Sequence, residues 1–172
     1  MKHRILVVDD EREMCEVLDE ELERRGYETD WLLSADEAFV RLGSQDYDVV
    51  VTDLNMRGMN GVELCDRIVR NRPDIPVIVV TGFGSLETAI ATLRAGAFDF
   101  LTKPFDMEEL SIAVERAIQH KELRAEVKRL REAVSPDRGR GEMLGTSAAM
   151  RTVHELVDRV APTEATVLIT GE

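Results

Sequence analysis

The chain has 172 residues, of which 44% are hydrophobic and 33% are charged. Its 34 acidic residues outnumber its 22 basic ones, which gives a formal net charge of -12. This length allows one well-packed core with some chain left over. The excess of acid argues against binding nucleic acid through its phosphates and suits cationic partners, including metal ions.

Cysteine usage and hydropathy bear on where the protein works. Cys15 and Cys65 lie in apolar helical patterns without metal-ligand spacing, which indicates buried thiols in a reducing compartment. No apolar run approaches the length of a membrane span. The opening "MKHRILVVDD" has too short an apolar run for a signal peptide. We therefore expect a cytoplasmic protein that does not contact a membrane.

Short β-branched runs alternate with segments of helical periodicity in the first two-thirds of the chain. Good N-cap residues followed three positions later by Glu predict helix starts at Asp10, Ser34, Asn60 and Asp106. Gly26, Gly43 and Gly96 fall where helices are expected to end. Five strands alternating with five helices predict an α/β fold with a doubly wound parallel sheet covered on both faces. The expected strands are Ile5–Val8, Thr29–Leu33, Asp48–Thr52, Val77–Val80 and Phe98–Leu101.

The fifth helix is expected to extend beyond a compact domain, because no Gly or Pro interrupts Met107–Val134. The apolar residues of its first half suit packing on the sheet. In its second half the apolar residues follow a heptad spacing. This spacing favours a short dimeric coiled coil over a solvated tail helix. The seam would consist of Leu123, Val127, Leu130 and Val134.

The pattern changes after this helix. The segment "SPDRGRG" reads as a linker, "TSAAMRTVHELVDRVAP" as a capped amphipathic helix and "ATVLITGE" as a strand. A chain that stops on an apolar strand without a pairing partner looks like a fragment cut inside a second domain. The domains expected are 1–122 for the sheet domain, 123–140 for the coiled-coil helix and linker, and 141–172 for the start of another domain.

Polar residues follow the strands at the edge where parallel sheets bind ligands. Asp9 and Asp10 follow the first strand, Asp53 the third, Thr81 the fourth and Lys103 the fifth. Each residue alone has an ordinary structural role, such as a helix cap or a turn. Three ionised carboxylates, however, come close together only with a compensating cation. Lys103 supplies one positive charge, and oxygen ligands with room for water suit Mg²⁺ for the rest.

The segments "ILVVDDE", "VVVTDLNMRGMNG", "VIVVTGFGS" and "FDFLTKPF" together resemble the receiver domain of bacterial two-component response regulators. The resemblance covers about the first 120 residues. It implies a flavodoxin-like fold with strand order 2-1-3-4-5. It also implies a signalling domain, not an enzyme, which catalyses only its own phosphorylation and dephosphorylation.

The same resemblance implies a role for each residue at the strand ends. Asp53 is expected to accept a phosphoryl group from a sensor histidine kinase. Asp10 is expected to bind Mg²⁺ directly, and Asp9 to hold a coordinated water. The backbone carbonyl of Asn55 would complete the protein's ligands to the metal. Lys103 would pair with Asp53 and then with a phosphoryl oxygen, and its bond to Pro104 is expected to be cis.

A conformational switch is implied as well. The hydroxyl of Thr81 would move towards the phosphoryl group, and Phe100 would turn into the space released. Many relatives have Tyr at that position, and Phe lacks its hydroxyl. The face formed by the fourth helix, the fifth strand and the fifth helix would then change and control a homodimer. Asn55 and Phe83 would tune the lifetime of the phosphoryl group, with the bulky Phe83 slowing its loss.

The last segment, "MLGTSAAMRTVHELVDRVAPTEATVLITGE", resembles the opening of the AAA+ ATPase domain in sigma-54-dependent activators of the nitrogen-regulation type. Only Gly171 and Glu172 of the phosphate-binding loop are present, so no complete nucleotide site is expected. Sigma-54 RNA polymerase and DNA would be partners only through further domains. Phosphorylation is expected to change how the linker helices pair and thereby to control the ATPase.

Two other classes use a similar fold. A magnesium-dependent phosphohydrolase also forms an aspartyl phosphate, but such enzymes usually have a second Asp two residues after the nucleophile, where this chain has Asn55. A flavin-binding module would need a phosphate-cradling loop after the first strand, and the acidic edge would repel the flavin phosphate. The phosphohydrolase is therefore the main alternative.

Overall fold

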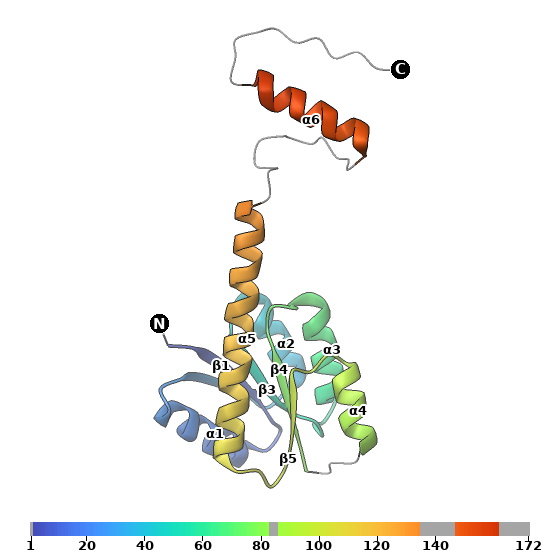
Figure 1. Cartoon of the computed structure of the whole chain (residues 1–172). Helices are drawn as coiled ribbons and strands as arrows, with labels where there is room; N and C mark the ends of the chain where they lie inside the picture. The colour runs from blue at the N-terminus through green and yellow to red at the C-terminus, as the bar shows by residue number, and fades with distance from the viewer. Residues whose placement is uncertain (1, 83–85, 135–146, 162–172) are drawn as a thin grey trace. The chain divides into compact units, whose positions relative to one another are not determined.

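The structure, a computed structural model, describes residues 2–82, 86–134 and 147–161. The chain divides into two compact units, Met1–Lys128 and Arg129–Glu172. The first unit contains a five-stranded parallel sheet with order β2-β1-β3-β4-β5 (Figure 1). The predicted α/β fold and strand order are confirmed. The strands are β1 (Arg4–Val8), β2 (Glu28–Leu32), β3 (Val49–Asp53), β4 (Val77–Thr81) and β5 (Asp99–Thr102).

Helices cover both faces of this sheet. On one face, α1 (Arg12–Arg24) and the first half of α5 (Met107–Val134) pack against alternate residues of the central strands. On the other face, α2 (Ala35–Ser44) and α3 (Gly61–Asn71) pack against the intervening residues. The fourth helix, α4 (Leu86–Arg94), lies against α3 and β5. Strands β3 and β4 are buried along their whole length, which explains their continuous apolar runs.

Three of the four predicted helix caps are present. Ser34 accepts a hydrogen bond from the amide of Glu37, Asn60 accepts one from Glu63, and Asp106 accepts one from Glu108. The predicted cap at Asp10 is wrong, because α1 has Glu11 as its N-cap residue without a side-chain hydrogen bond. The Asp10 carboxylate instead accepts a hydrogen bond from the loop after β3.

The predicted helix ends are confirmed at two of three glycines. Gly26 and Gly96 follow α1 and α4 with φ of 93° and 90°, a backbone conformation that favours glycine. The prediction for Gly43 is wrong, because this residue lies inside α2. That helix ends one residue later, where the amide of Gln45 and the hydroxyl of Ser44 both donate to the carbonyl of Arg41.

The long fifth helix has the predicted bounds, Met107–Val134. In the second unit, α6 (Ala148–Val160) is capped by Ser147, which accepts a hydrogen bond from the amide of Met150. The strand predicted over residues 165–172 and the linker over residues 135–141 lie outside the described residues. Within the ranges that the structure describes, no helix is long and apolar enough to cross a membrane.

Candidate functional site

The order of the sheet reverses between β1 and β3, and the candidate site lies at the carboxyl ends of these two strands. The register pairs Val8 with Thr52. The residues that follow, Asp9 and Asp53, therefore come side by side where the two strands end. Both are buried, with 3% and 7% of their surface exposed. Two buried carboxylates at adjacent positions require a cation between them.

Lys103 supplies that cation. Its Nζ lies 2.8 Å from Oδ2 of Asp9 and 2.8 Å from Oδ1 of Asp53. The lysine follows β5 at the far side of the sheet, and its backbone amide donates to the carbonyl of Thr81 at 2.7 Å. The peptide bond between Lys103 and Pro104 is cis, as expected. The side chain thus reaches across the end of β4 to both acids.

The second oxygen of each carboxylate accepts a backbone hydrogen bond. Oδ1 of Asp9 accepts from the amide of Glu11 at 2.9 Å, and Oδ2 of Asp53 accepts from the amide of Asn55 at 2.6 Å. These amides belong to the turns that directly follow β1 and β3. Each acid is therefore fixed on one side by Lys103 and on the other by its own turn.

Asp10, the third acid expected at this edge, is turned differently. Its Oδ2 accepts a hydrogen bond from the amide of Arg57 at 3.3 Å, which links the turn after β1 to the loop after β3. Among the described residues, no group of three or more His, Cys, Asp or Glu side chains stands ready to hold a metal ion. The structure therefore brings Asp9 and Asp53 together around Lys103, with Asp10 at the margin.

The electrostatics of the site follow from this arrangement. Burial alone would lower the pKa of Lys103, but the hydrogen bonds and charges of Asp53 and Asp9 outweigh it and hold the pKa above its ordinary value. Cys15 lies behind the site, where its thiol donates to the carbonyl of Asp9 at 3.4 Å. Burial and the charge of Asp9 raise the pKa of this thiol to about 11. The lysine is therefore a stable cation, and the neighbouring cysteine stays neutral.

Of the two residues predicted to form the switch, Thr81 lies on β4 and Phe100 on the neighbouring strand β5. Thr81 ends β4, is fully buried and pairs in register with Thr102. Phe100 pairs with Val79 and packs against the apolar cluster between the sheet and α3. Asn55 is exposed in the turn after Asp53. Phe83 lies outside the described residues.

Sequence reasoning missed the contribution of Gly61, the first residue of α3. A Cβ atom at this position would lie 2.2 Å from the backbone oxygen of Asp53. Only glycine lets the helix begin this close to the acceptor strand, and its amide donates to the carbonyl of Leu54 at 3.0 Å. The glycine directly after the cap Asn60 was visible in the sequence, but nothing there indicates contact with Asp53. The sequence also gives no indication that the amide of Arg57 binds Asp10.

The predicted coiled-coil seam lies apart from this site, on α5. Leu123, Val127 and Leu130 are 64%, 38% and 51% exposed. Val134 is the last residue of the helix, and its side chain lies outside the described residues. The helix itself is confirmed, and the pairing of the seam with a second copy stays a prediction.

Comparison with known proteins shows which family the chain belongs to. The profile of the response regulator receiver domain matches residues 5–115. The nitrogen assimilation regulatory protein NtrX of Azorhizobium caulinodans is 35% identical over 173 residues, which covers 99% of this chain and 37% of that protein. The chain thus spans little more than a third of the length of this curated relative.

Solved structures agree with this comparison. The structure of NtrX from Brucella abortus in complex with ADP matches with a TM-score of 0.74 and 35% identity, over 95% of this chain and 36% of that one. The solution structure of the beryllofluoride-activated NtrC4 receiver domain dimer matches with a TM-score of 0.66 and 37% identity, over 69% of this chain and 98% of that one. The receiver profile covers the sheet, the paired acids and Lys103, so this chain belongs to the response regulator receiver domain family of two-component signalling.

Proposed function

We propose that Asp53 accepts a phosphoryl group from a phosphohistidine of a sensor histidine kinase, and that the change controls a transcription activator. The observation that carries this proposal is the position of Lys103, 2.8 Å from oxygens of both Asp53 and Asp9. A cation fixed beside the acceptor carboxylate is placed to stabilise charge on a transferring phosphoryl group. The phosphoacceptor role thus explains why a lysine reaches this far to two buried acids.

The transfer needs few groups. An oxygen of Asp53 attacks phosphorus, a new O–P bond forms, and the N–P bond of the donor breaks with its electron pair left on the imidazole. Lys103 then exchanges its contact with the carboxylate for one with a phosphoryl oxygen. The amide of Asn55, already 2.6 Å from Oδ2 of Asp53, holds the carboxylate in one orientation during the attack.

Receiver domains generally bind Mg²⁺ at the phosphorylation site, and the donors present here fit that ion. Asp9, Asp10 and Asp53 offer carboxylate oxygens, and Asn55 offers its backbone carbonyl in the exposed turn. The two buried carboxylates share a single lysine, which leaves the group with a net negative charge, so an additional positive charge is favourable there. When bound, Mg²⁺ supplies positive charge for the phosphoryl oxygens. Asp9 and Asp10 would hold the ion, with Asp9 acting through a coordinated water.

The switch we propose begins at the end of β4. The hydroxyl of Thr81 moves towards the phosphoryl oxygens, and Phe100 on the neighbouring strand turns into the space that the loop after β4 leaves. Phe100 is only partly buried, so a change of its rotamer would not have to move a fully buried side chain. Asn55 and Phe83 would set how readily water reaches the phosphoryl group.

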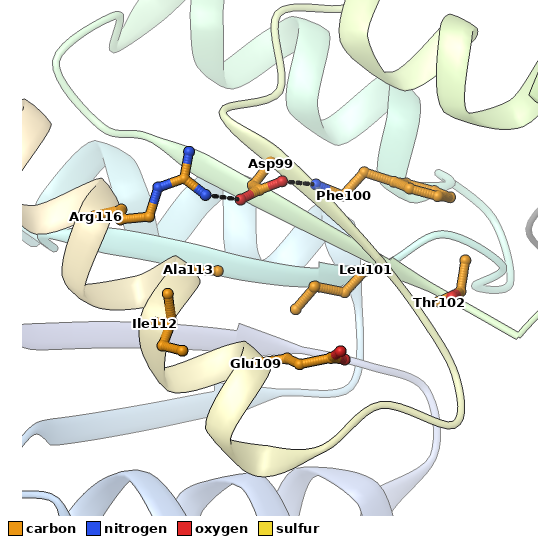
Figure 2. A pocket seen from close by; sticks show the side chains of 8 residues that line it. All are labelled: Asp99, Phe100, Leu101, Thr102, Glu109, Ile112, Ala113 and Arg116. Atoms are coloured by element: carbon orange, nitrogen blue, oxygen red, sulfur yellow. Dashed lines mark hydrogen bonds and ion pairs between the residues drawn. The ribbon is translucent and has the colours of Figure 1, made fainter.

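The output face we propose is formed by α4, β5 and α5. A groove of about 440 Å³ lies between β5 and α5, with Asp99, Phe100, Ile112 and Arg116 among the residues that line it (Figure 2). Nη1 of Arg116 lies 3.3 Å from Oδ2 of Asp99, and a dashed line marks this ion pair in Figure 2. Ile112 is 49% exposed beside this ion pair. An apolar side chain framed by charges is typical of a protein interface.

Helical periodicity extends this face along α5. At about 100° per residue, Ile112, Leu123 and Val127 lie roughly 110–170° around the helix from the centre of the stripe that packs on the sheet. That stripe consists of Leu110, Ala113, Val114, Ala117 and Ile118. The exposed apolar residues of α5 therefore share one side, which faces away from the domain's own core. This side suits a homodimer that pairs through the groove and along α5 at Leu123 and Val127.

Several wider expectations belong to the same proposal. The protein is cytoplasmic, and the domain catalyses only its own phosphorylation and dephosphorylation. Residues 141–172 would begin an AAA+ ATPase domain, and phosphorylation would change the pairing of the linker helices that controls it. The ATPase, sigma-54 RNA polymerase and DNA would be reached through further domains. The similarity to NtrX over nearly the whole chain supports this architecture.

Incubation with acetyl phosphate and Mg²⁺, followed by intact mass measurement, tests the proposal. The wild type should gain the mass of one phosphoryl group, and Asp53→Ala should gain none. Asp66→Asn is the matched control, because this α3 acid is paired with Arg70 at the surface, 3.0 Å away, and lies outside the proposed site. Equal labelling of wild type and Asp53→Ala would refute the assignment of the acceptor.

A further inference from the structure

A second charged cluster lies at the other end of the sheet, where the strands begin, and none of the roles above uses it. Asp48 directly precedes β3, the strand that ends in Asp53. Its Oδ2 accepts a hydrogen bond from the amide of Arg4 at 3.0 Å and lies 3.4 Å from Nδ1 of His3. Its Oδ1 faces α5, the helix that leaves the domain at this end.

On α5, the residue that binds Oδ1 of Asp48 is Lys121. Its Nζ donates to Oδ1 of Asp48 at 2.8 Å and to the backbone carbonyl of Tyr47 at 2.8 Å. The lysine and Asp48 side chains are only 23% and 29% exposed. Burial alone would raise the pKa of Asp48, but hydrogen bonds from Lys121 and from the amide of Arg4 outweigh it and lower that pKa. The contact is thus a two-acceptor attachment with fixed geometry, unlike a single exposed ion pair.

Lys121 lies where the packing of α5 on the sheet ends. The residue lies three and four positions after Ile118 and Ala117, so it continues the side of α5 that packs on the sheet. Beyond it, Arg124 reaches the carbonyl of Pro73 at 3.5 Å, the limit of a hydrogen bond. Lys121 therefore makes two short hydrogen bonds to the domain just where the apolar packing of α5 ends.

We propose that Lys121 is a positioning residue for the output helix. By binding Tyr47 and Asp48 it fixes the rotation of α5 about its axis where the helix leaves the sheet. That rotation keeps the side with Ile112 and Leu123 turned away from the domain and towards a second copy of the chain. The consequence for pairing rests on the proposed homodimer, whereas the attachment of the helix does not.

Hydrogen exchange of the α5 amides tests the attachment. Lys121→Met should raise the exchange rate over residues 119–128 by about fivefold or more, because the end of the helix then opens locally. Lys121→Arg should restore protection, since a guanidinium can reach the same two acceptors. Lys128→Met is the matched control, seven residues further on the same side and exposed. The amides of α1 serve as the reference for an intact fold.

Cross-linking tests the consequence for pairing. Leu123→Cys should give a disulfide between two copies under oxidation in the phosphorylated protein, because Leu123 is exposed, whereas Cys15 and Cys65 are buried. Addition of Lys121→Met should reduce the yield several-fold, and Lys121→Arg should restore it. Unchanged exchange in Lys121→Met, or equal changes in Lys128→Met, would overturn the proposal.

Phosphoryl uptake separates this inference from the proposed function. Lys121→Met should accept a phosphoryl group from acetyl phosphate at the wild-type rate, because the cluster lies at the opposite end of β3. No phosphoryl uptake in the wild type would refute the phosphoacceptor role. The positioning role of Lys121 would then be judged by the hydrogen exchange of the α5 amides alone. Normal uptake with unchanged exchange would refute the role of Lys121 alone.

Discussion

At the scale of single residues, the site depends on how Lys103 is shared between two acids. The lysine gives one hydrogen bond to Asp9 and one ion-pair contact to Asp53, both at 2.8 Å. Backbone amides hold the other carboxylate oxygens. The arrangement is preorganised for an additional anion, because the positive charge is already in place before any phosphoryl group arrives.

Replacement of this lysine should separate phosphorylation from metal binding. Lys103→Met should slow phosphoryl uptake by about 100-fold, since the charge that stabilises the transferring group is lost. It should not weaken Mg²⁺ binding, because the substitution removes the lysine ammonium that competes with Mg²⁺ for the two carboxylates. Uptake is followed by intact mass, and metal binding by the rise of the unfolding temperature with Mg²⁺. Wild-type uptake in this variant, with Lys128→Met as control, would contradict the role of Lys103.

Asp48 should contribute to stability in a pH-dependent way. Its pKa is lowered from the ordinary 3.8, so its stabilisation is complete above that value and is lost as the pH falls through the folded pKa. The stability difference between wild type and Lys121→Met should therefore be constant from about pH 7 to pH 5 and shrink below about pH 4. Urea unfolding at each pH measures this difference. His3 is present in both proteins. A stability difference between wild type and Lys121→Met that grows as the pH falls would contradict the prediction.

At the scale of elements, the close approach of α3 to β3 fixes the turn that directly follows Asp53. The helix begins at Gly61, whose amide binds the carbonyl of Leu54. Ser34 and Asn60 cap α2 and α3 as their local sequence predicts, because a cap needs only a side chain three residues before the amide that it binds. Asp10 departs from this pattern, because the amide of Arg57, 47 positions away, engages its carboxylate.

Two glycine substitutions should have opposite effects on stability. Gly61→Ala should destabilise the domain by about 1–3 kcal/mol, because the new Cβ would meet the backbone of Asp53, which cannot move aside without shifting β3. Gly43→Ala should stabilise it by about 0.5–1 kcal/mol, because this position is helical and has no atom within 4 Å of the added Cβ. Urea unfolding of both variants measures the two shifts. Equal shifts of the same sign would rule out the close approach as the cause.

At the scale of the whole molecule, α5 connects the sheet to a surface that the domain itself does not cover. One side of the helix packs on the sheet, and the other carries exposed apolar residues. Exposed apolar side chains at regular spacing are costly in water unless a partner covers them. A second copy of the chain would cover all of them along one axis.

A charge placed in this seam should weaken self-association. Leu123→Glu should lower the association constant of the phosphorylated protein by about tenfold or more, because a buried carboxylate in the seam lacks a partner. Sedimentation velocity over a concentration series measures the change. Val40→Glu is the control, because this α2 residue is 74% exposed and lies outside the proposed face. An equal effect of both substitutions would point to a different interface.

The sequence alone was sufficient for the alternation of strands and helices, the bounds of α5, three of the four caps and the identity of the residues at the strand ends. These features depend on near neighbours along the chain, through periodicity, capping and turn chemistry. The resemblance already predicted that Lys103 pairs with Asp53. Tertiary structure alone decided that the same lysine also binds Asp9, that Asp10 turns to Arg57, and that Lys121 binds Tyr47 and Asp48. Those contacts join residues far apart in the chain, and only the packed sheet brings their atoms within hydrogen-bonding distance.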